Sequence, residues 1–396
     1  MVKMNCSVYI HIPFCRSRCT YCDFNTFAGK DNLISPYVNA LCNEVIHVST
    51  SIRDIPTIHT VYFGGGTPSL LSPQHLKLVL STLRSYYSLE RDCEITIEAN
   101  PGTLDLLKLE GYRELGINRI SMGVQSLLSD ELKLLGRIHS KGEVYQSILN
   151  AKEMDFENIG TDLIFGIPGQ TVGSLRETVE QLISLGVNHL SAYSLSIEPG
   201  TPLAGMINSG MITPCDDDVI ADMYETLMDW LEGAGYNQYE ISNWSSVALG
   251  KDYRCRHNLQ YWYYEPWLGF GAGASSYFNQ YRFTNLLGIE EYIAKCEIGF
   301  YEKEPFIAAS QIEHVNFDQE MDETMMMGLR LTQEGVRRQR FIDRFGHDYL
   351  DIYSKEIDQL VNSGLLEFVG EQNGILRLTR KGRMLGNQVF MRFLRD

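Results

Sequence analysis

Over the first 200 residues, short runs that are rich in apolar, β-branched and aromatic residues alternate with segments of helical spacing. Runs of this composition are typical of strands. Of the segments between them, Ser72–Tyr87 begins with an N-cap serine before proline, and Gly173–Gly186 ends at a glycine. The strand candidates are SVYIHI (7–12), HTVYF (59–63), CEITIEA (93–99), RISMGV (119–124), NIGTDLIF (158–165) and HLSAYSLSI (189–197).

Strand–helix alternation predicts a parallel sheet built from right-handed βαβ units. Six such units fit into the chain, fewer than the eight of a closed (β/α)₈ barrel. We therefore expect an α/β fold whose first domain, residues 1–215, is a partial (β/α)6 TIM-like barrel. A doubly wound sheet is the alternative.

The strict alternation fades after about residue 215. We expect residues 216–320 to form an aromatic-rich connecting region that opens with a helix at Asp218–Glu232. Residues 321–396 then show two helical segments, the short strands GLLEFV and GILRLT, and a final helix opened by KGRML. This order predicts a C-terminal α+β extension that ends in a winged-helix-like module, although such a fold does not imply DNA binding.

Nearly every predicted strand of the barrel ends in glycine, proline and polar residues. The carboxyl ends of barrel strands build the active site in proteins of this type. Because Glu98, Gln125 and Asp162 lie at or next to strand ends, we expect their side chains to converge on one mouth. The segments that follow the strands are the cysteine cluster, GGGTP (64–68), EANPGT (98–103), GVQS (123–126), GIPGQT (166–171) and EPGTP (198–202).

Composition and charge narrow the range of partners. The 396 residues are 44% hydrophobic and 21% charged, with a net charge of −16, which argues against nonspecific nucleic-acid binding. A basic C-terminal stretch, residues 377–395, is interpreted as a solvated helix face; contact with an acceptor or an anionic membrane surface is the other interpretation. No signal-peptide pattern and no apolar run of about 18 residues is present, so we expect a cytoplasmic protein.

Three cysteines, Cys15, Cys19 and Cys22, form a C-x₃-C-x₂-C triplet. In a reducing compartment such a cluster indicates metal or redox chemistry. Zinc, with His11 as fourth ligand, is one interpretation. A [4Fe–4S] cluster held by three thiolates, with one iron open to another ligand, is a second, and unclustered free thiols are a third. Cys42 lies inside a predicted helix and is a poor fourth ligand.

The sequence CRSRCTYC (15–22) resembles the signature of the radical S-adenosylmethionine (radical SAM) superfamily, including the aromatic Tyr21 before the third cysteine. GGGTP, at the end of the second strand, resembles the loop that receives the methionine amino group in that superfamily. The resemblance implies a [4Fe–4S] cluster whose open iron binds S-adenosylmethionine, and a radical formed by one-electron cleavage of that molecule.

YIHIPFC, YFGGGTP, EANP, MGVQS, GR (136–137) and TDLIFGIPGQ are closer still to one branch, which contains oxygen-independent coproporphyrinogen III oxidase and a haem chaperone. The resemblance implies a role for each matching position. The cluster ligands are Cys15, Cys19 and Cys22. The positions implied to contact S-adenosylmethionine are Tyr9, Tyr21, Gly65, Gly66, Thr67, Glu98, Gln125, Arg137 and Asp162.

HNLQYW (257–262) resembles the HN-x-x-YW motif of the chaperones. His257 can offer an imidazole to haem iron, and Cys255 is a rival ligand. Arg254 and Arg256 could pair with propionates, while the aromatic residues at 261–264 and 267 could supply flat apolar walls. A packed core or surface histidine is the alternative interpretation of His257.

Two departures separate this chain from the oxidases of the branch. Phe24 stands where the oxidase has a further cysteine, and only fourteen residues precede Cys15. We therefore expect a haem chaperone that binds haem and passes it to acceptor proteins. The alternative is a radical SAM oxidative decarboxylase of coproporphyrinogen III, and the third possibility is a zinc-stabilised binding module.

Overall fold

The structure is a computed structural model that describes residues 5–247, 250–298 and 305–395. The chain folds as two compact units, each made of two segments that are distant in the sequence. The first unit comprises Met1–Met223 and Pro266–His314, and the second comprises Tyr224–Glu265 and Val315–Asp396.

This division differs from the three consecutive domains predicted at 1–215, 216–320 and 321–396. The predicted connecting region is split, because its first part packs with the C-terminal segment and its last part extends the barrel sheet. Sequence periodicity marks local elements but carries no signal for pairing between segments this far apart.

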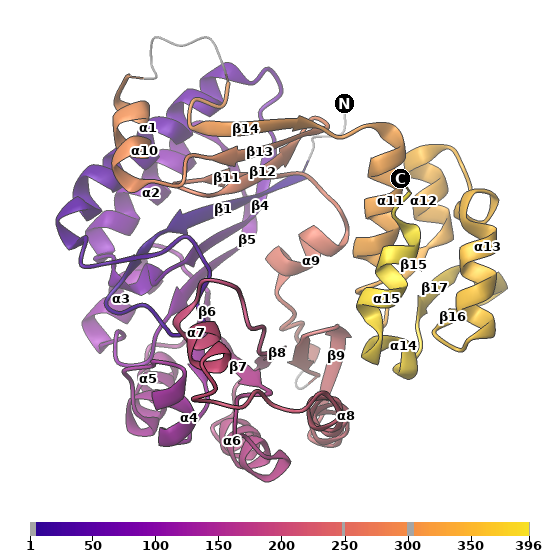
Figure 1. The fold of residues 1–396 in the computed structure, drawn as a ribbon. Coiled ribbons are helices and arrows are strands. Elements are labelled where there is room, and N and C mark those ends of the chain that lie inside the picture. The colour runs from indigo at the N-terminus through magenta and orange to yellow at the C-terminus, as the bar shows by residue number, and fades with distance from the viewer. Residues whose placement is uncertain (1–4, 248–249, 299–304, 396) are drawn as a thin grey trace. The chain divides into compact units, whose positions relative to one another are not determined.

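The first unit contains the six predicted strands as neighbours, all parallel, in the order of the chain. The partial (β/α)6 barrel is therefore confirmed (Figure 1). The strands are β1 (Asn5–Ile12), β4 (Thr57–Gly65), β5 (Ser88–Ala99), β6 (Arg119–Gln125), β7 (Asn158–Phe165) and β8 (His189–Ser194).

Helices connect these strands and bury one apolar face each. In α2 the Ser72 hydroxyl accepts a hydrogen bond from the His75 backbone N–H, and proline occupies the first helical position, as predicted. The helices are α1 (Ile34–Ser51), α2 (Pro73–Tyr86), α3 (Leu106–Glu114), α4 (Ser129–Leu134), α5 (Lys141–Glu153), α6 (Val172–Ser184) and α7 (Pro202–Asn208). The next helix, α8 (Asp217–Gly233), contains the boundary between the units.

A four-stranded extension, which the sequence did not predict, continues the sheet on the free side of β1. β11 pairs parallel with β1, joining Ser7 to Trp267 and Ile10 to Phe270, and the remaining strands follow antiparallel. The extension consists of β11 (Trp267–Phe270), β12 (Ser275–Phe278), β13 (Tyr281–Asn285) and β14 (Ala309–His314), with helix α10 (Ile289–Ile298) after β13.

Glu44, a buried residue of α1, fixes the turn after β11. Its carboxylate accepts hydrogen bonds from the Gly271 N–H (2.8 Å), from Asn285 Nδ2 (2.7 Å) and from the Tyr292 hydroxyl (2.5 Å). Burial raises the pKa of Glu44 to about 7, although the three hydrogen-bond donors oppose this rise. The turn that Glu44 holds packs against the segment that enters the cysteine loop, since a Cβ on Gly271 would lie 2.6 Å from the His11 carbonyl oxygen.

The second unit has its own apolar core, in which Met325, Phe341, Tyr349, Ile357 and Leu376 are buried. The predicted helices and terminal hairpin are present; the winged-helix likeness stays a prediction. No helix within the described ranges is long and apolar enough to cross a membrane. The elements are β9 (Tyr236–Glu240), β10 (Asn243–Ser246), α9 (Arg256–Trp262), α11 (Phe317–Gly328), β15 (Val336–Arg337), α12 (Arg338–Phe345), α13 (Tyr349–Asn362), β16 (Leu366–Val369), β17 (Ile375–Leu378), α14 (Arg380–Met384) and α15 (Gly386–Phe390).

Candidate functional site

A cavity of about 500 Å³ opens at the carboxyl ends of the barrel strands. The strands β4 to β8 and the cysteine loop each contribute residues to its wall. This agrees with the prediction that the strand ends form one shared site. The predicted residues that line it are Cys15, Cys19, Tyr21, Cys22, Gly65, Gly66, Thr67, Glu98, Gln125, Arg137 and Asp162. Their common location is the main structural support for one binding site.

The cysteine loop begins at β2 (Phe14–Cys15), directly after β1, and closes at β3 (Phe27–Ala28), which pairs parallel with β2. All three thiols are partly buried, and each has a polar neighbour. The Thr67 hydroxyl donates to Cys15 Sγ (3.6 Å), Arg137 Nη1 donates to Cys19 Sγ (3.4 Å), and Cys22 Sγ is hydrogen-bonded to the Thr26 hydroxyl (3.8 Å). Burial raises the pKa of the Cys15 thiol, although the hydrogen bond from the Thr67 hydroxyl opposes this effect.

The GGGTP loop lies directly against this cysteine loop. The Gly66 N–H donates to the Ile12 carbonyl (2.9 Å) and the Thr67 N–H to that of Phe14 (2.8 Å). A Cβ on Gly66 would lie 2.7 Å from the Phe14 carbonyl oxygen and 3.0 Å from Cys15 Sγ. Glycine is therefore required at position 66 by the close approach of the two loops.

Two carboxyl groups, Glu98 from β5 and Asp162 from β7, face the cavity. Glu98 accepts hydrogen bonds from the Tyr62 hydroxyl (2.9 Å) and from the Gly65 N–H (3.1 Å). Burial, and next the charge of Asp162, raise the pKa of Glu98 to about 7. Burial also raises the pKa of Asp162, although hydrogen bonds from Ser191 and Ser121 and the charge of Arg119 oppose this effect. A buried acidic pair of this kind is suited to hydroxyl or cationic groups of a ligand.

Arg137 joins the cysteine loop to the ends of β5 and β6. Its Nη2 atom donates to Asn100 Oδ1 (2.5 Å) and to the Gly123 carbonyl (2.6 Å). Its Nε atom is buried and has no hydrogen-bond partner within the described residues. Because an unsatisfied buried donor costs stability, this N–H is a candidate contact for a ligand that enters the cavity.

Gln125 ends β6 with a backbone φ of 67°, in the left-handed region that non-glycine residues rarely adopt. The register of β6 against β7 shifts between Gly123 and Gln125. Strained backbone of this type clusters at binding sites, where the surrounding structure holds it. The sequence identified Gln125 by its place at a strand end but gave no sign of this strain.

Tyr9 and His11 contact each other near the end of β1. The Tyr9 hydroxyl is 3.0 Å from His11 Nδ1, and its ring stacks on Tyr62 with centroids 6.3 Å apart. His11 Nε2 donates to the Asn25 carbonyl (2.9 Å). Both ring nitrogens of His11 are therefore engaged by Tyr9 and Asn25, and zinc ligation by His11 would require one of these bonds to be exchanged. Tyr9 packs between His11 and Tyr62, and it is not among the residues that line the cavity.

Several lining residues were not predicted. Tyr62 and Ser121 face inward from β4 and β6, as the alternation of side chains along a strand could have indicated. Asn100 belongs to the EANP segment, so the motif could have identified it. The residues from β8 to Glu198 add a further part of the wall, of which the sequence marked only the EPGTP segment. The additional polar residues outside the cysteine loop are Tyr62, Asn100, Ser121, Tyr193, Ser194, Ser196 and Glu198.

His257 lies in the second unit, at the start of α9, and only 1% of it is exposed. Its Nε2 atom is hydrogen-bonded to the Tyr261 hydroxyl (3.0 Å), with the two rings at 90°. Cys255 is also fully buried. Haem ligation by either residue therefore stays a prediction, and it requires α9 to open or His257 to exchange its partner.

Comparison with known proteins agrees with the fold and the cavity. The model of the Radical SAM superfamily matches residues 9–182, and that of the HemN C-terminal domain matches residues 316–385. The chain is thus a radical SAM protein, a class whose members carry a [4Fe–4S] cluster and S-adenosylmethionine. The solved structure of coproporphyrinogen III oxidase (HemN) from Escherichia coli covers 99% of this chain and 90% of its own with a TM-score of 0.82, at 21% identity.

Two curated relatives define the group more closely. The haem chaperone HemW of Bacillus subtilis is 36% identical over 390 residues, which are 98% of this chain and 99% of that protein. HemW of Escherichia coli is 39% identical over 280 residues, which are 69% and 71% of the two chains. The chain therefore belongs to the HemW family of the radical SAM superfamily.

Proposed function

We propose that this protein is a haem chaperone that binds haem and passes it to acceptor proteins, while it carries a [4Fe–4S] cluster with bound S-adenosylmethionine. One observation carries the proposal. The similarity to the haem chaperone HemW of Bacillus subtilis extends over 98% of the chain and so includes both the cysteine loop and HNLQYW.

The cofactor part of the proposal concerns the barrel cavity. Cys15, Cys19 and Cys22 hold the cluster, and the missing fourth cysteine leaves one iron for S-adenosylmethionine. When bound and reduced, the cluster would supply one-electron chemistry to this molecule. Around it, this chain provides glycine backbone, carboxylates and a guanidinium. The proposed S-adenosylmethionine contacts are Tyr9, Tyr21, Gly65, Gly66, Thr67, Glu98, Gln125, Arg137 and Asp162.

The haem part concerns α9. In this proposal His257 ligates haem iron after it gives up its hydrogen bond with Tyr261. Exchange of that bond costs about 1 kcal/mol, which is small beside the strength of a metal–imidazole bond. Haem-accepting proteins are the partners of the final step.

Oxidative decarboxylation of coproporphyrinogen III is the second candidate, and the fold shared with HemN is what favours it. Phe24 opposes it, because this position carries a cysteine in the oxidase branch. Phe24 is 63% exposed at the rim of the cavity, next to Cys22. A large apolar side chain at this place is available for contact with another molecule and cannot ligate a metal.

One anaerobic experiment separates the two functions. The protein is reconstituted with iron and sulfide, then given S-adenosylmethionine, a reductant and coproporphyrinogen III. We expect no protoporphyrinogen IX, and its formation would contradict the chaperone proposal. In parallel, haem is titrated into the wild type and into His257→Ala; an unchanged Soret band and affinity in the variant would remove His257 as ligand.

A further inference from the structure

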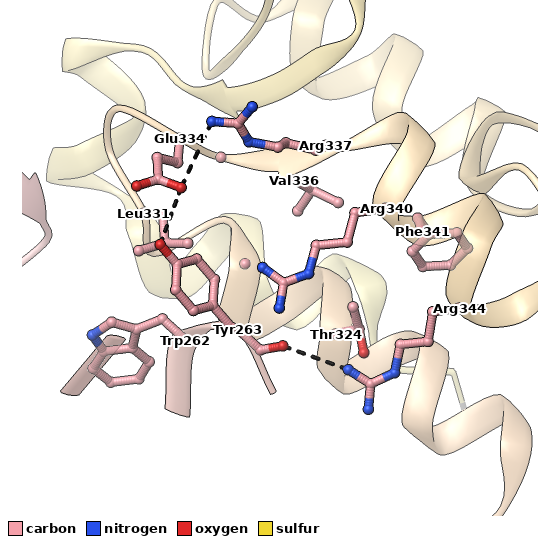
Figure 2. A pocket seen from close by; sticks show the side chains of 12 residues that line it. Trp262, Tyr263, Thr324, Leu331, Glu334, Val336, Arg337, Arg340, Phe341 and Arg344 are labelled. Atoms are coloured by element: carbon pink, nitrogen blue, oxygen red, sulfur yellow. Dashed lines mark hydrogen bonds and ion pairs between the residues drawn. The ribbon is translucent and has the colours of Figure 1, made fainter. Parts of the chain in front are cut away.

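A pocket in the second unit lies at the end of α9, where HNLQYW ends (Figure 2). Aromatic and arginine side chains face one another across it, and its volume is about 40 Å³. We refer to it as the aromatic–arginine pocket, defined by Trp262, Tyr263, Glu334, Arg337, Arg340 and Arg344.

Arg340 and Arg344 are four residues apart on α12, which places them on one face of that helix, and Arg337 precedes the helix in β15. The Arg340 guanidinium lies over the Tyr263 ring, 4.5 Å from its centroid. Arg344 has a structural role, since Nη1 donates to the Tyr264 carbonyl (2.9 Å) and Nη2 to Glu320 (2.6 Å). Figure 2 shows Arg340 pointing between Tyr263 and Thr324, toward the centre of the pocket.

Glu334 is the one carboxylate in the wall of the pocket, and other groups already engage it. It accepts hydrogen bonds from Arg254 Nη1 (2.6 Å) and from the Tyr263 hydroxyl (3.0 Å). Its distance to Arg337 is 3.8 Å, longer than a hydrogen bond. The side chain of Arg337 is 56% exposed, so its donors are open to an incoming anion.

Arg340 is the second open cation. Its Nη2 atom forms an ion pair with Glu265 and its guanidinium stacks on Tyr263, yet 45% of its side chain is exposed and its other N–H groups have no carboxylate partner within the described residues. A guanidinium has five N–H donors in a planar fork that matches a carboxylate. Arg254, which the sequence suggested for propionates, is instead engaged by Asp252 and Glu334.

We propose that the aromatic–arginine pocket binds a propionate carboxylate of haem, with Arg337 and Arg340 as donors. This inference rests on the haem-binding function proposed above. The pocket volume of about 40 Å³ compares with the roughly 10–15 Å³ that one water needs on the same measure, so the pocket has room for a carboxylate and not for a macrocycle. The flat ring then lies outside, against the aromatic residues at the rim. On a chain with a net charge of −16, such a site gives a dianionic ligand a defined orientation.

The test compares haem with haem dimethyl ester, whose propionates carry no charge. Both are titrated into the cluster-loaded wild type, followed by the Soret band. We expect the ester to bind about tenfold more weakly or worse, because each charge-assisted hydrogen bond contributes about 1.5–3 kcal/mol. The double variant Arg337→Gln/Arg340→Gln should lose the same factor for haem and leave ester binding unchanged.

Arg338→Gln is the matched control. Arg338 is on the same helix and is 40% exposed, but it pairs with Asp348 and does not line the pocket; its replacement should leave haem affinity unchanged. Equal binding of haem and ester by the wild type would contradict the proposed role of the pocket, but it would leave the proposed haem binding intact. Absence of haem binding by the wild type would overturn the proposed function and the pocket together. The comparison of the two ligands uses the wild type, so it holds even if a variant folds poorly.

Discussion

The ionisation of Glu98 should control the affinity for S-adenosylmethionine. Burial and the charge of Asp162 raise the Glu98 pKa to about 7, while hydrogen bonds from Tyr62 and Gly65 oppose the rise. One pH unit from a pKa changes the ratio of the two forms tenfold. Glu98 is therefore about one-tenth ionised at pH 6 and about nine-tenths ionised at pH 8.

S-adenosylmethionine presents ribose hydroxyls, an aminium group and a sulfonium cation, all of which favour an ionised carboxylate over a neutral one. If Glu98 contacts the bound molecule, its affinity for the cluster-loaded protein should rise about ninefold from pH 6 to pH 8, in proportion to the ionised fraction. Anaerobic equilibrium dialysis at constant ionic strength measures this change.

The variant Glu98→Gln should bind S-adenosylmethionine weakly with no pH dependence over the same range. Glu153→Gln, at an exposed position of α5, is the control and should keep the wild-type profile. A flat profile for the wild type, or a ninefold rise that persists in Glu98→Gln, would refute the assignment of Glu98 to this ligand.

Three further changes test other parts of the structure. Gly66→Ala should abolish cluster incorporation, measured as iron and sulfide per protein, because its Cβ would lie 3.0 Å from Cys15 Sγ; full occupancy would contradict the required close approach. The raised pKa of Glu44, about 7 instead of 4.5, stabilises the fold below pH 4.5, and this contribution is lost as the pH rises through 7. Glu44→Gln should therefore remove about 3 kcal/mol of pH dependence from the free energy of unfolding in urea, and an unchanged pH profile would refute it. Tyr261→Phe should remove the hydrogen bond at His257 Nε2 and tighten haem binding up to about fivefold, the equivalent of about 1 kcal/mol; weaker binding would count against His257 as the ligand.

The barrel could be predicted from the sequence because its signals are local. Each of the six strands alternates or is continuously apolar, and each is followed by a turn or a capped helix such as α2, which starts after Ser72. The extension β11 to β14 could not, since the pairing of Ser7 with Trp267 joins residues far apart in the chain. The sequence of a four-residue strand does not indicate which other strand it pairs with.

For the site as well, the sequence predicted some features and not others. Motif and strand-end position were sufficient to place Glu98, Gln125, Arg137 and Asp162 around one cavity. The raised pKa of Glu98 depends on its burial and on the nearby charge of Asp162, and the strain at Gln125 accompanies a register shift. Neither is encoded in residue type.

HNLQYW shows a third case. Its resemblance to the chaperone motif implied a haem ligand, with a packed histidine as the alternative, and the structure buries His257 and bonds it to Tyr261, one helical turn away. Helical spacing i, i+4 brings these two side chains together, and that pairing could have been read from the sequence. Burial by the rest of the second unit could not.

Haem transfer tests the central claim most directly. The haem-loaded, cluster-containing protein is mixed with an excess of an apo-haemoprotein, and the Soret spectrum of the acceptor is followed over time. A chaperone should deliver its haem completely to the acceptor, and faster than haem is lost to solvent. Retention of haem by this protein, or transfer no faster than spontaneous haem release, would contradict the account.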